Sequence, residues 1–253
     1  MAEKLISLVT GGGKGIGRAI ALRLAKETKV VVIGRTAPDL ASVCDEICAG
    51  GGSAFHFTGD VRDGRMLSVA MRYIDSNGWV LRNVICNAGI AKGGPTHEFP
   101  MDKWKEIMDV NVNGTFNVVR ETLPLLLREK RGNICIISST AGLQGFAYTA
   151  AYCASKHALV GLARSLAQEY GKQGIVAVPI CPGYVDTEMT ARTIHGLMKR
   201  SGITEAEARA KVAKTNPQNR IISTEEIAEA VAMVCSGKYP ALNGSPLILS
   251  GGS

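Results

Sequence analysis

The chain has 253 residues, of which 46% are hydrophobic and 20% charged, and its formal net charge is +7. This composition is that of a folded globular protein and excludes a disordered one. No apolar run reaches the roughly 18 residues that a membrane-spanning helix needs, so we expect no membrane span. Because few residues precede the first predicted strand, we expect no secretory signal.

The positive charge suits an anionic partner. Nucleic acid is not expected, because the Lys and Arg residues are spread along the chain without a basic run or interleaved aromatic residues. Small anionic ligands such as phosphates fit this distribution better.

The seven cysteines form no CxxC pair, and Cys86, Cys135 and Cys181 lie in apolar runs typical of strands. Cys44 and Cys48 are four apart on a predicted helix, but no further ligand completes a metal site. We therefore expect a cytoplasmic protein with free thiols and no bound metal.

Strand and helix patterns alternate along the whole chain. Seven apolar, β-branched runs are predicted strands: Leu5–Val9, Val30–Ile33, Ala54–Thr58, Val80–Cys86, Asn133–Ile137, Ile175–Ile180 and Pro246–Leu249. Helical periodicity covers Gly15–Lys26, Pro38–Ala49, Gly64–Asn77, Met101–Arg128 with a bend near Pro124, Thr149–Tyr170, and Thr224–Cys235 with Thr224 as its cap. Apolar strands separated by helices indicate a parallel sheet covered on both faces. With no linker or repeat, we expect one domain over residues 1–253.

The segment Thr10-Gly-Gly-Gly-Lys-Gly-Ile-Gly17 follows the first predicted strand and opens the first helix. A glycine-rich loop at this position lets the backbone approach a diphosphate, and the helix N-terminus favours its negative charge. The glycines that matter, Gly11, Gly15 and Gly17, do not have the common G-x-G-x-x-G spacing. A plain glycine-rich turn therefore remains an alternative.

About 20 residues beyond such a loop, an NAD-binding fold places an acidic residue on the adenosine ribose. This chain has Gly34-Arg35 there, and the nearest carboxylate, Asp39, lies in a sequence that resembles a capping box beginning at Thr36. Arg35 and Lys14 would instead bracket a 2′-phosphate, which a guanidinium binds in bidentate fashion. The pattern favours NADP(H), with NAD(H) possible, although each cation taken alone could be a solvated surface residue.

Tyr152 and Lys156 are four residues apart on the predicted helix Thr149–Tyr170, so their side chains share one face. The ammonium favours the phenolate, and we expect it to lower the tyrosine pKa from its usual value of about 10. Ser139 follows the apolar strand Asn133–Ile137, where its hydroxyl could face the same spot. A Tyr-x-x-x-Lys pair alone is a weak indication, because such residues usually lie on a surface.

Seven motifs occur in one order at compatible spacing: Thr10-Gly-x-x-x-Gly-Ile-Gly17, Asp60-Val61, Asn87-Ala-Gly89, Asn111-Val-Asn-Gly114, Ser139, Tyr152-x-x-x-Lys156, and Pro182-Gly183 with Thr187. Over essentially its whole length the chain resembles the short-chain dehydrogenase/reductases, an NAD(P)-dependent family. The resemblance implies an α/β fold, a Rossmann-type three-layer sandwich with a seven-stranded parallel sheet and helices on both faces.

The resemblance also implies a role for each matching residue. Tyr152 would protonate a carbonyl oxygen in reduction, or act as the base in oxidation, and Lys156 would lower its pKa and hold the nicotinamide ribose. Ser139 would hydrogen-bond the carbonyl oxygen, and Asn111 would hold a water that connects Lys156 to solvent. The implied cofactor-binding residues are Gly11, Gly13, Lys14, Gly15, Ile16, Gly17, Arg35, Asp60, Val61, Asn87, Ala88, Gly89, Tyr152, Lys156, Pro182, Gly183, Val185 and Thr187. Alternatively, Asn111 could be an interior polar group and Pro182-Gly183 simply a loop.

Two positions depart from the family pattern. Cys86 stands where the family often has Asn, which loses a polar contact but no catalytic atom. Ala177-Val178-Pro179 stands where Val-Asn is frequent before Pro182-Gly183. A proline in that strand removes a backbone donor, so we expect a weakened ladder near the nicotinamide.

Residues 188–219 would lie over the active site as a substrate lid. The basic residues of this lid segment are Arg192, His195, Lys199, Arg200, Arg209, Lys211 and Lys214. They suit a 3-oxoacyl thioester on coenzyme A or acyl carrier protein, and the general pattern resembles 3-oxoacyl-thioester and polyketide ketoreductases. The expected apolar lining is Leu143, Phe146, Ile194, Leu197 and Met198.

Two other functions remain open. The lid charges could be merely solvated, with a free secondary alcohol or hydroxy acid as substrate. The chain could also be a non-catalytic NADP-binding scaffold, because a fold alone does not imply activity.

The helices Met101–Arg128 and Thr149–Tyr170 carry apolar residues on more than one face, among them Val118, Leu125, Leu126, Ala158, Leu162 and Leu166. One face would cover the sheet and another would need a partner. With the family resemblance, this leads us to expect a homotetramer.

Overall fold

The computed structural model describes residues 4–252, which form one seven-stranded sheet in the order β3-β2-β1-β4-β5-β6-β7. All neighbouring strands in it are parallel. The strands are β1 (Leu5–Thr10), β2 (Lys29–Gly34), β3 (Ala54–Thr58), β4 (Val80–Cys86), β5 (Gly132–Ile137), β6 (Ile175–Pro182) and β7 (Leu247–Leu249). The chain adds β2 and β3 on one side of β1 and the remaining strands on the other. Such a reversal opens a crevice at the carboxyl ends of the two central strands.

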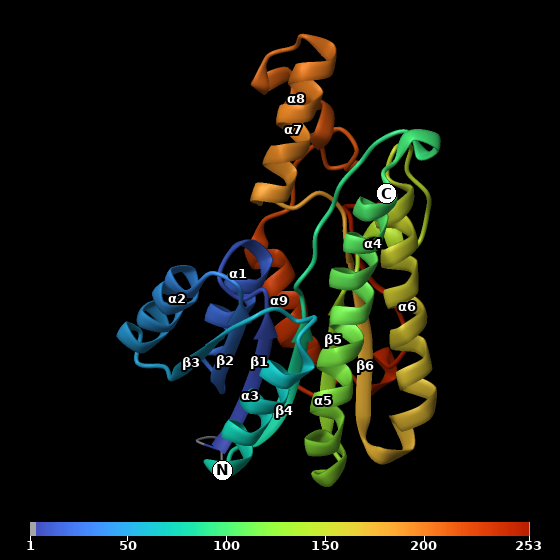
Figure 1. The fold of residues 1–253 in the computed structure, drawn as a ribbon. Helices are drawn as coiled ribbons and strands as arrows, with labels where there is room; N and C mark the ends of the chain where they lie inside the picture. The colour runs from blue at the N-terminus through green and yellow to red at the C-terminus, as the bar shows by residue number, and fades with distance from the viewer. Residues whose placement is uncertain (1–3, 253) are drawn as a thin grey trace.

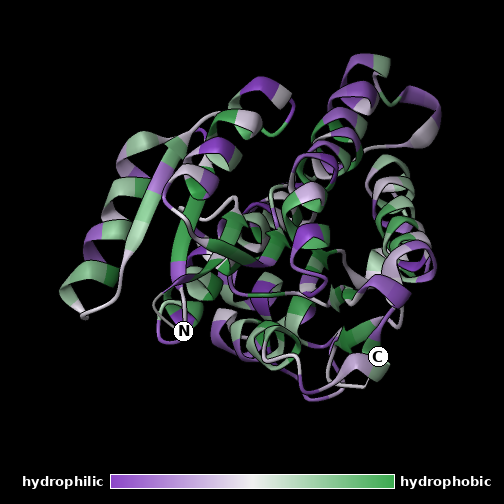
Figure 2. Ribbon diagram, turned by 90° about the horizontal axis from the view of Figure 1, so that it is seen from below, coloured by the Kyte–Doolittle hydropathy of each residue, from purple (hydrophilic) through white to green (hydrophobic). Residues whose placement is uncertain are grey.

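Helices cover both faces of the sheet, as Figure 1 shows. One face carries α1 (Gly15–Leu24), α2 (Ala37–Ala49) and α9 (Thr224–Cys235), and the other carries α3 (Gly64–Ser76), α5 (Gly114–Arg128) and α6 (Ala150–Tyr170). Alternate strand residues serve the two cores: Val30 and Val32 lie in one, Val31 and Ile33 in the other. Figure 2 shows hydrophobic residues on the strands and hydrophilic residues on the outer helix faces. The predicted Rossmann-type sandwich is confirmed.

The predicted long helix before β5 is not one regular helix. It divides into α4 (Met101–Met108), a π-helical turn (Asp109–Asn113) and α5. An irregularity therefore lies around Asn111, while α5 continues through Pro124. Pro124 is exposed, so the backbone hydrogen bond that it cannot donate is lost on the solvent side of α5. Single π turns are often found at functional sites.

Pro179 does not interrupt β6. It pairs with Ile136, and the pairing with β5 continues to the end of that strand. Two residues earlier, the Ala177 N–H donates to Asn243 and the Ala177 carbonyl accepts from Gly244, both away from β5. The nitrogen of Pro179 lies on the same side of β6, away from β5, so the hydrogen bond that it cannot donate is not one to β5. The pairing of β6 with β7 begins only at Ile180. The expected weakening of the ladder is not observed.

The lid segment forms α7 (Glu188–Ser201) and α8 (Glu205–Ala213), which protrude beyond the carboxyl ends of the strands (Figure 1). It has a hydrophobic cluster of its own, in which Ile194 packs with Ala208 and Val212. Leu197 and Met198 pack against this cluster. Ile194 is only 4% exposed because it packs within this segment. The prediction that it lines a substrate pocket is therefore not supported.

Two smaller expectations concern the cap of α9 and the outer faces of α5 and α6. The cap of α9 is Ser223, which forms a reciprocal capping box with Glu226, so Thr224 is the first helical residue instead. Of the apolar residues noted on α5 and α6, Val118, Leu126 and Leu166 belong to the face that covers the sheet. Leu125 and Leu162 are only partly buried, and the exposed Phe116 of α5 adds to the outer face.

Within residues 4–252, none of the helices is both long and apolar enough to cross a membrane.

Candidate active site

The glycine-rich loop joins β1 to α1 with little space for side chains. Gly11 (φ +64°) and Gly15 (φ +52°) adopt the left-handed conformation that favours glycine. A Cβ at Gly17 would lie 2.2 Å from the carbonyl oxygen of Gly11, and one at Gly13 would lie 3.0 Å from Cβ of Asp39. Beyond the loop, the partly buried Ile16 packs against the core. The bare backbone fits a loop that lies close to a diphosphate.

Asn87 and Thr10 hold this loop against the end of β4. The Asn87 side-chain amide donates to the carbonyl oxygens of Thr10 (3.0 Å) and Gly11 (3.1 Å). The buried Thr10 hydroxyl accepts from the backbone N–H groups of Asn87 (3.0 Å) and Ala88 (3.2 Å) and lies 3.3 Å from the carbonyl oxygen of Ile85. Thr10 is not among the predicted cofactor-binding residues, although it begins the glycine-rich motif.

A cleft of about 140 Å³ opens beside the loop, at the carboxyl ends of the central strands. Its lining residues are Gly11, Gly34, Arg35, Gly59, Asp60, Val61, Ala88, Gly89, Ile90 and Val110. Six of the predicted cofactor residues lie among them, and the glycines leave backbone open to a ligand. The cleft and the bare loop together fit a dinucleotide.

Asp60 is already engaged by a neighbouring cation. Arg62 donates to both of its carboxylate oxygens, at 3.0 and 2.8 Å. These hydrogen bonds are the main cause that lowers the pKa of Asp60, with a smaller contribution from the charge of Arg35. The carboxylate therefore stays ionised at the rim of the cleft.

The other half of the site lies at the ends of β5 and β6. Lys156 is 5% exposed and donates to the Ile137 carbonyl at 2.8 Å. Its Nζ lies 5.6 Å from the ring centre of Tyr152 and 3.7 Å from the position that a Cβ of Gly89 would take. Helix α6 thus carries both predicted residues to the edge of the dinucleotide cleft.

Burial decides the ionisation of this pair. It raises the pKa of Tyr152 to about 12, and a hydrogen bond with the Ser139 side chain offsets only part of the rise. Burial also lowers the pKa of Lys156 to about 8. The expected lowering of the tyrosine pKa was wrong, because exclusion of water disfavours both charged forms. The phenol consequently keeps its proton at neutral pH.

Asn111 projects from the π turn into the same region. Its Oδ1 accepts from the Ile90 N–H (2.8 Å), and its Nδ2 donates to the Ile90 carbonyl (2.9 Å) and to Ser155 Oγ (3.0 Å). Ser155 in turn donates to the Tyr152 carbonyl at 2.8 Å. A Cβ at Gly89 would lie 3.2 Å from Asn111 Oδ1, which places this amide next to Lys156.

Two serines that sequence reasoning missed hold this half of the site together. Ser138, 3% exposed, donates to the Lys156 carbonyl at 2.9 Å. Ser155, fully buried, links Asn111 to the turn of α6 that carries Tyr152. Each directly precedes a predicted residue, but only the structure shows that both side chains point inward.

Ser139 and the end of β6 complete the site. Ser139 Oγ lies 3.4 Å from the Pro182 carbonyl, and the Gly183 N–H donates to Leu249 at 2.9 Å. Beyond them, Val185 bridges to Ile222 and is 4% exposed, so its side chain packs in the core. Thr187 precedes α7 as its cap residue and lies against Gly15, whose Cβ would be 3.2 Å from Thr187 Cγ2.

The predicted capping role of Asp39 is wrong. Within the described chain, the Thr36 side chain makes no capping hydrogen bond to α2. Asp39 instead forms an ion pair with Lys14, at 3.3 Å, and Lys14 lies 3.5 Å from Glu188. Lys14 is therefore shared between two carboxylates, whereas Arg35 lines the cleft.

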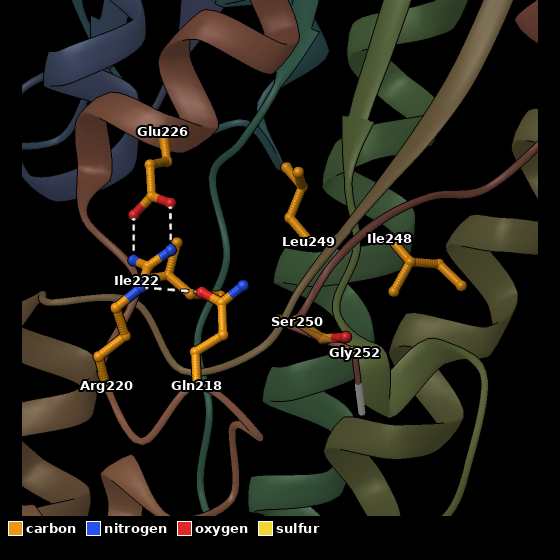
Figure 3. A pocket seen from close by; sticks show the side chains of 9 residues that line it. Gln218, Arg220, Ile222, Glu226, Ile248, Leu249, Ser250 and Gly252 are labelled. Carbon is orange, nitrogen blue, oxygen red and sulfur yellow. Dashed lines mark hydrogen bonds and ion pairs between the residues drawn. The ribbon is translucent and has the colours of Figure 1, made fainter.

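A larger cavity of about 490 Å³ lies between the exit of the lid segment and the end of β7 (Figure 3), and its lining residues Leu249 and Ile222 contact Gly183 and Val185. Arg220 crosses it and donates to both oxygens of Glu226, at 2.6 and 2.7 Å, and to Gln218 at 2.9 Å. Within this cavity, Arg220, Glu226 and Gln218 therefore satisfy one another. Residues 4–252 contain no cluster of three or more His, Cys, Asp or Glu side chains suited to a metal ion.

Comparison with known proteins agrees with this geometry. The short chain dehydrogenase family matches residues 5–197. A monensin polyketide synthase putative ketoacyl reductase from Streptomyces virginiae is 31% identical, with 98% of this chain and 96% of the relative covered. A 2-(S)-hydroxypropyl-CoM dehydrogenase from Xanthobacter autotrophicus is 33% identical, with 96% and 94% covered.

Among solved structures, a variant of actinorhodin polyketide ketoreductase with NADPH superimposes with a TM-score of 0.95. It is 31% identical, and the match covers 100% of this chain and 98% of the other. Both the fold and the family match extend through the glycine-rich loop and the Tyr152–Lys156 helix. The chain therefore belongs to the short-chain dehydrogenase/reductase family and is an oxidoreductase that uses a nicotinamide cofactor.

Proposed function

We propose that the protein is an NADP(H)-dependent reductase that converts a ketone to a secondary alcohol, with a 3-oxoacyl thioester as the substrate. The observation that carries this proposal is the cluster of Ser139, Tyr152 and Lys156, in which Lys156 Nζ lies next to Gly89 at the edge of the cleft. A bound nicotinamide cofactor supplies the hydride, and the chain supplies the position of the carbonyl group and its proton.

Two hydroxyl groups would meet the substrate carbonyl oxygen. Tyr152 keeps its proton because burial raises its pKa to about 12, so it donates that proton as negative charge develops on the oxygen. Ser139, hydrogen-bonded to the Tyr152 side chain, is placed to donate to the same oxygen. The Lys156 ammonium, with a pKa near 8, then stabilises the phenolate that forms.

Asn111 would hold a water between Lys156 and solvent. Its amide hydrogens and one lone pair of Oδ1 are used by Ile90 and Ser155. The second lone pair of Oδ1 is then the one left to accept from such a water. Replacing Asn111 with Leu should slow turnover while leaving nicotinamide binding largely intact, and a water-mediated relay predicts a solvent isotope effect that changes with it.

Tyr152→Phe separates an enzyme from a binding scaffold. The variant should bind cofactor nearly as well as the parent and lose turnover, because only the phenolic proton is removed. Both proteins would be followed by NADPH absorbance on a broad panel of ketones and alcohols. If the parent oxidises no NADPH with any of them, the scaffold function is the better description.

The NADP(H) preference depends mainly on Arg35. It is exposed at the cleft, and no carboxylate in residues 4–252 pairs with it, so it is free to bind a 2′-phosphate. Fluorescence titration should show tighter binding of NADPH than of NADH, and Arg35→Asp should shrink or reverse the difference. Tighter NADH binding by the parent would contradict the preference and leave NAD(H) as the cofactor.

The substrate class follows from residues 188–219, which we assign as the lid. Arg209 is held by Asp186 at 2.8 Å, whereas Arg192 and Lys199 are exposed on α7 and can meet a phosphate-bearing carrier. The name of the monensin relative favours a ketoacyl substrate, while that of the hydroxypropyl-CoM relative favours the alternative, a dehydrogenase of a free secondary alcohol or hydroxy acid.

Steady-state kinetics distinguish these substrates. Acetoacetyl-CoA should show a higher kcat/KM than an uncharged ketone of similar acyl length, and Arg192→Ala with Lys199→Ala should reduce this advantage at low salt. Equal values, unaffected by the double substitution, would remove the carrier from the proposal and leave the reductase itself in place.

We further propose a homotetramer in the cytoplasm. The exposed Phe116 and the partly buried Leu125 and Leu162 leave apolar area on the outer faces of α5 and α6. The cysteines of the described chain are all free thiols, which suits a reducing compartment. Light scattering at micromolar concentration should give a tetramer, and a monomer would contradict the assembly.

A further inference from the structure

The lysine of the glycine-rich loop connects three separate parts of the chain. Lys14 Nζ lies 3.3 Å from Asp39 Oδ2 on α2 and 3.5 Å from Glu188 Oε1, the first residue of α7. Packing holds the lid against the loop here, because a Cβ at Gly15 would lie only 3.2 Å from Thr187 Cγ2. The ammonium is thus outnumbered by carboxylates, one of them supplied by the lid.

The position of this cluster matters for the adenosine ribose. Asp39 lies at the start of α2, four residues after Arg35, where an adenosine ribose binds in dinucleotide folds. Within residues 4–252 Arg35 forms no ion pair, whereas Lys14 is held by two carboxylates that a 2′-phosphate would have to displace. Their hydrogen bonds and charges raise the pKa of Lys14, with Asp39 the larger cause, so the ammonium is stabilised where it now lies.

We propose that Glu188 is a positioning residue for cofactor choice: it lowers the affinity for NADP(H) relative to NAD(H) by withholding Lys14 from the 2′-phosphate. The proposal rests on the proposed function only in placing that phosphate near Arg35 and Lys14. Both cofactors carry the same diphosphate and differ in the one phosphate group, so the ratio of their affinities isolates the effect.

Removal of the Glu188 charge should therefore favour NADPH. Glu188 and Lys14 side chains are 68% and 57% exposed, and exposed ion pairs of this kind change an equilibrium by about two- to fivefold. We expect Glu188→Gln to tighten NADPH binding by about that factor, with little change for NADH, at low ionic strength. About 0.5 M salt should remove most of the difference.

The matched control is Glu205→Gln. Glu205 is also exposed and also begins a lid helix, α8, so its replacement reproduces any loss of helix-end stabilisation. Glu205 makes no contact with Lys14, so the NADPH-to-NADH affinity ratio of the Glu205→Gln variant should equal that of the parent. A second pair, Lys14→Met with and without Glu188→Gln, tests whether the effect passes through the lysine.

Fluorescence titrations of NADPH and NADH with these five proteins decide the proposal without a substrate. The expected result is a raised ratio in Glu188→Gln alone and no further rise when Lys14 is already Met. An equal NADPH-to-NADH affinity ratio in Glu188→Gln and Glu205→Gln would overturn the proposal. An equal rise of that ratio when Glu188→Gln is added to Lys14→Met would also overturn it, because Glu188 would then repel the 2′-phosphate directly. A parent that prefers NADH would contradict the proposed cofactor but would leave this comparison of ratios readable.

Discussion

Replacing Lys156 with Met should make the folded protein more stable at neutral pH while it abolishes turnover. Lys156 is 5% exposed, and burial lowers its pKa from 10.5 to about 8. One pKa unit corresponds to about 1.4 kcal/mol, so holding this ammonium charged below pH 8 costs the fold on the order of 3 kcal/mol. Losing its 2.8 Å hydrogen bond and leaving the Ile137 carbonyl unpaired costs about 1–3 kcal/mol. The net gain is on the order of 1 kcal/mol.

The sign of the effect depends on pH. Between about pH 8 and 10.5 the unfolded chain still binds the lysine proton while the folded protein has released it. The unfolded state then binds more protons, so the stability of the parent rises with pH in this window relative to the variant. The advantage of Lys156→Met should be largest below pH 8, shrink above it, and become a disadvantage near pH 10.

Urea denaturation of both proteins from pH 6 to 10 measures this difference directly. Lys172→Met, at an exposed position, controls for the loss of one positive charge. The difference between the unfolding free energies of the parent and Lys156→Met at each pH cancels the titration of the groups that both proteins share. A variant that is less stable than the parent at pH 7, or a difference that does not change with pH, would refute the assignment of Lys156 as a destabilising buried charge.

Three further substitutions test how the site is held together. Thr10→Val keeps the shape of the side chain but leaves two backbone N–H groups without their acceptor, and should lower the free energy of unfolding by about 2 kcal/mol; denaturant titration measures it, and an unchanged midpoint would count against the network. Gly17→Ala places a Cβ only 2.2 Å from the Gly11 carbonyl oxygen, so the loop must shift and cofactor binding should be lost in a fluorescence titration; near-normal binding would contradict the close approach. Ser138→Ala removes the donor to the Lys156 carbonyl and should cost about 1 kcal/mol, with a fall in kcat larger than any change in KM; equal changes in both would point to a general loss of structure.

Local patterns were sufficient for the architecture. Alternating apolar runs and helical periodicity located all seven strands. The central strands are nearly continuously apolar because they are buried on both faces. The motif residues from Gly11 to Thr187 could be named in advance because their order and spacing resemble those of a known family. Those that follow a strand meet at one edge of the sheet, because parallel strands bring their carboxyl ends there.

Effects that depend on contacts distant in sequence could not be predicted this way. The π turn at Asn111 is one, since no local pattern distinguishes it from a regular helix. The partners of Asp39 are another: Thr36 is close in sequence, but Lys14 is close in space. The inward-facing Ser138 and Ser155 are a third, because a serine beside a motif carries no signal of its orientation.

The amino-acid sequence by itself determined the Rossmann-type sheet, from the order of its apolar runs, and the family, from the order and spacing of its motifs. The tertiary structure alone decided how the motif residues ionise and to what they are bound. Tyr152 and Lys156 share a helix face in any reading, yet burial, which the whole fold creates, keeps the phenol protonated and lowers the pKa of the lysine. Exclusion of water is a property of the packed molecule, so spacing along a helix could indicate the pair but not the direction of its pKa shifts.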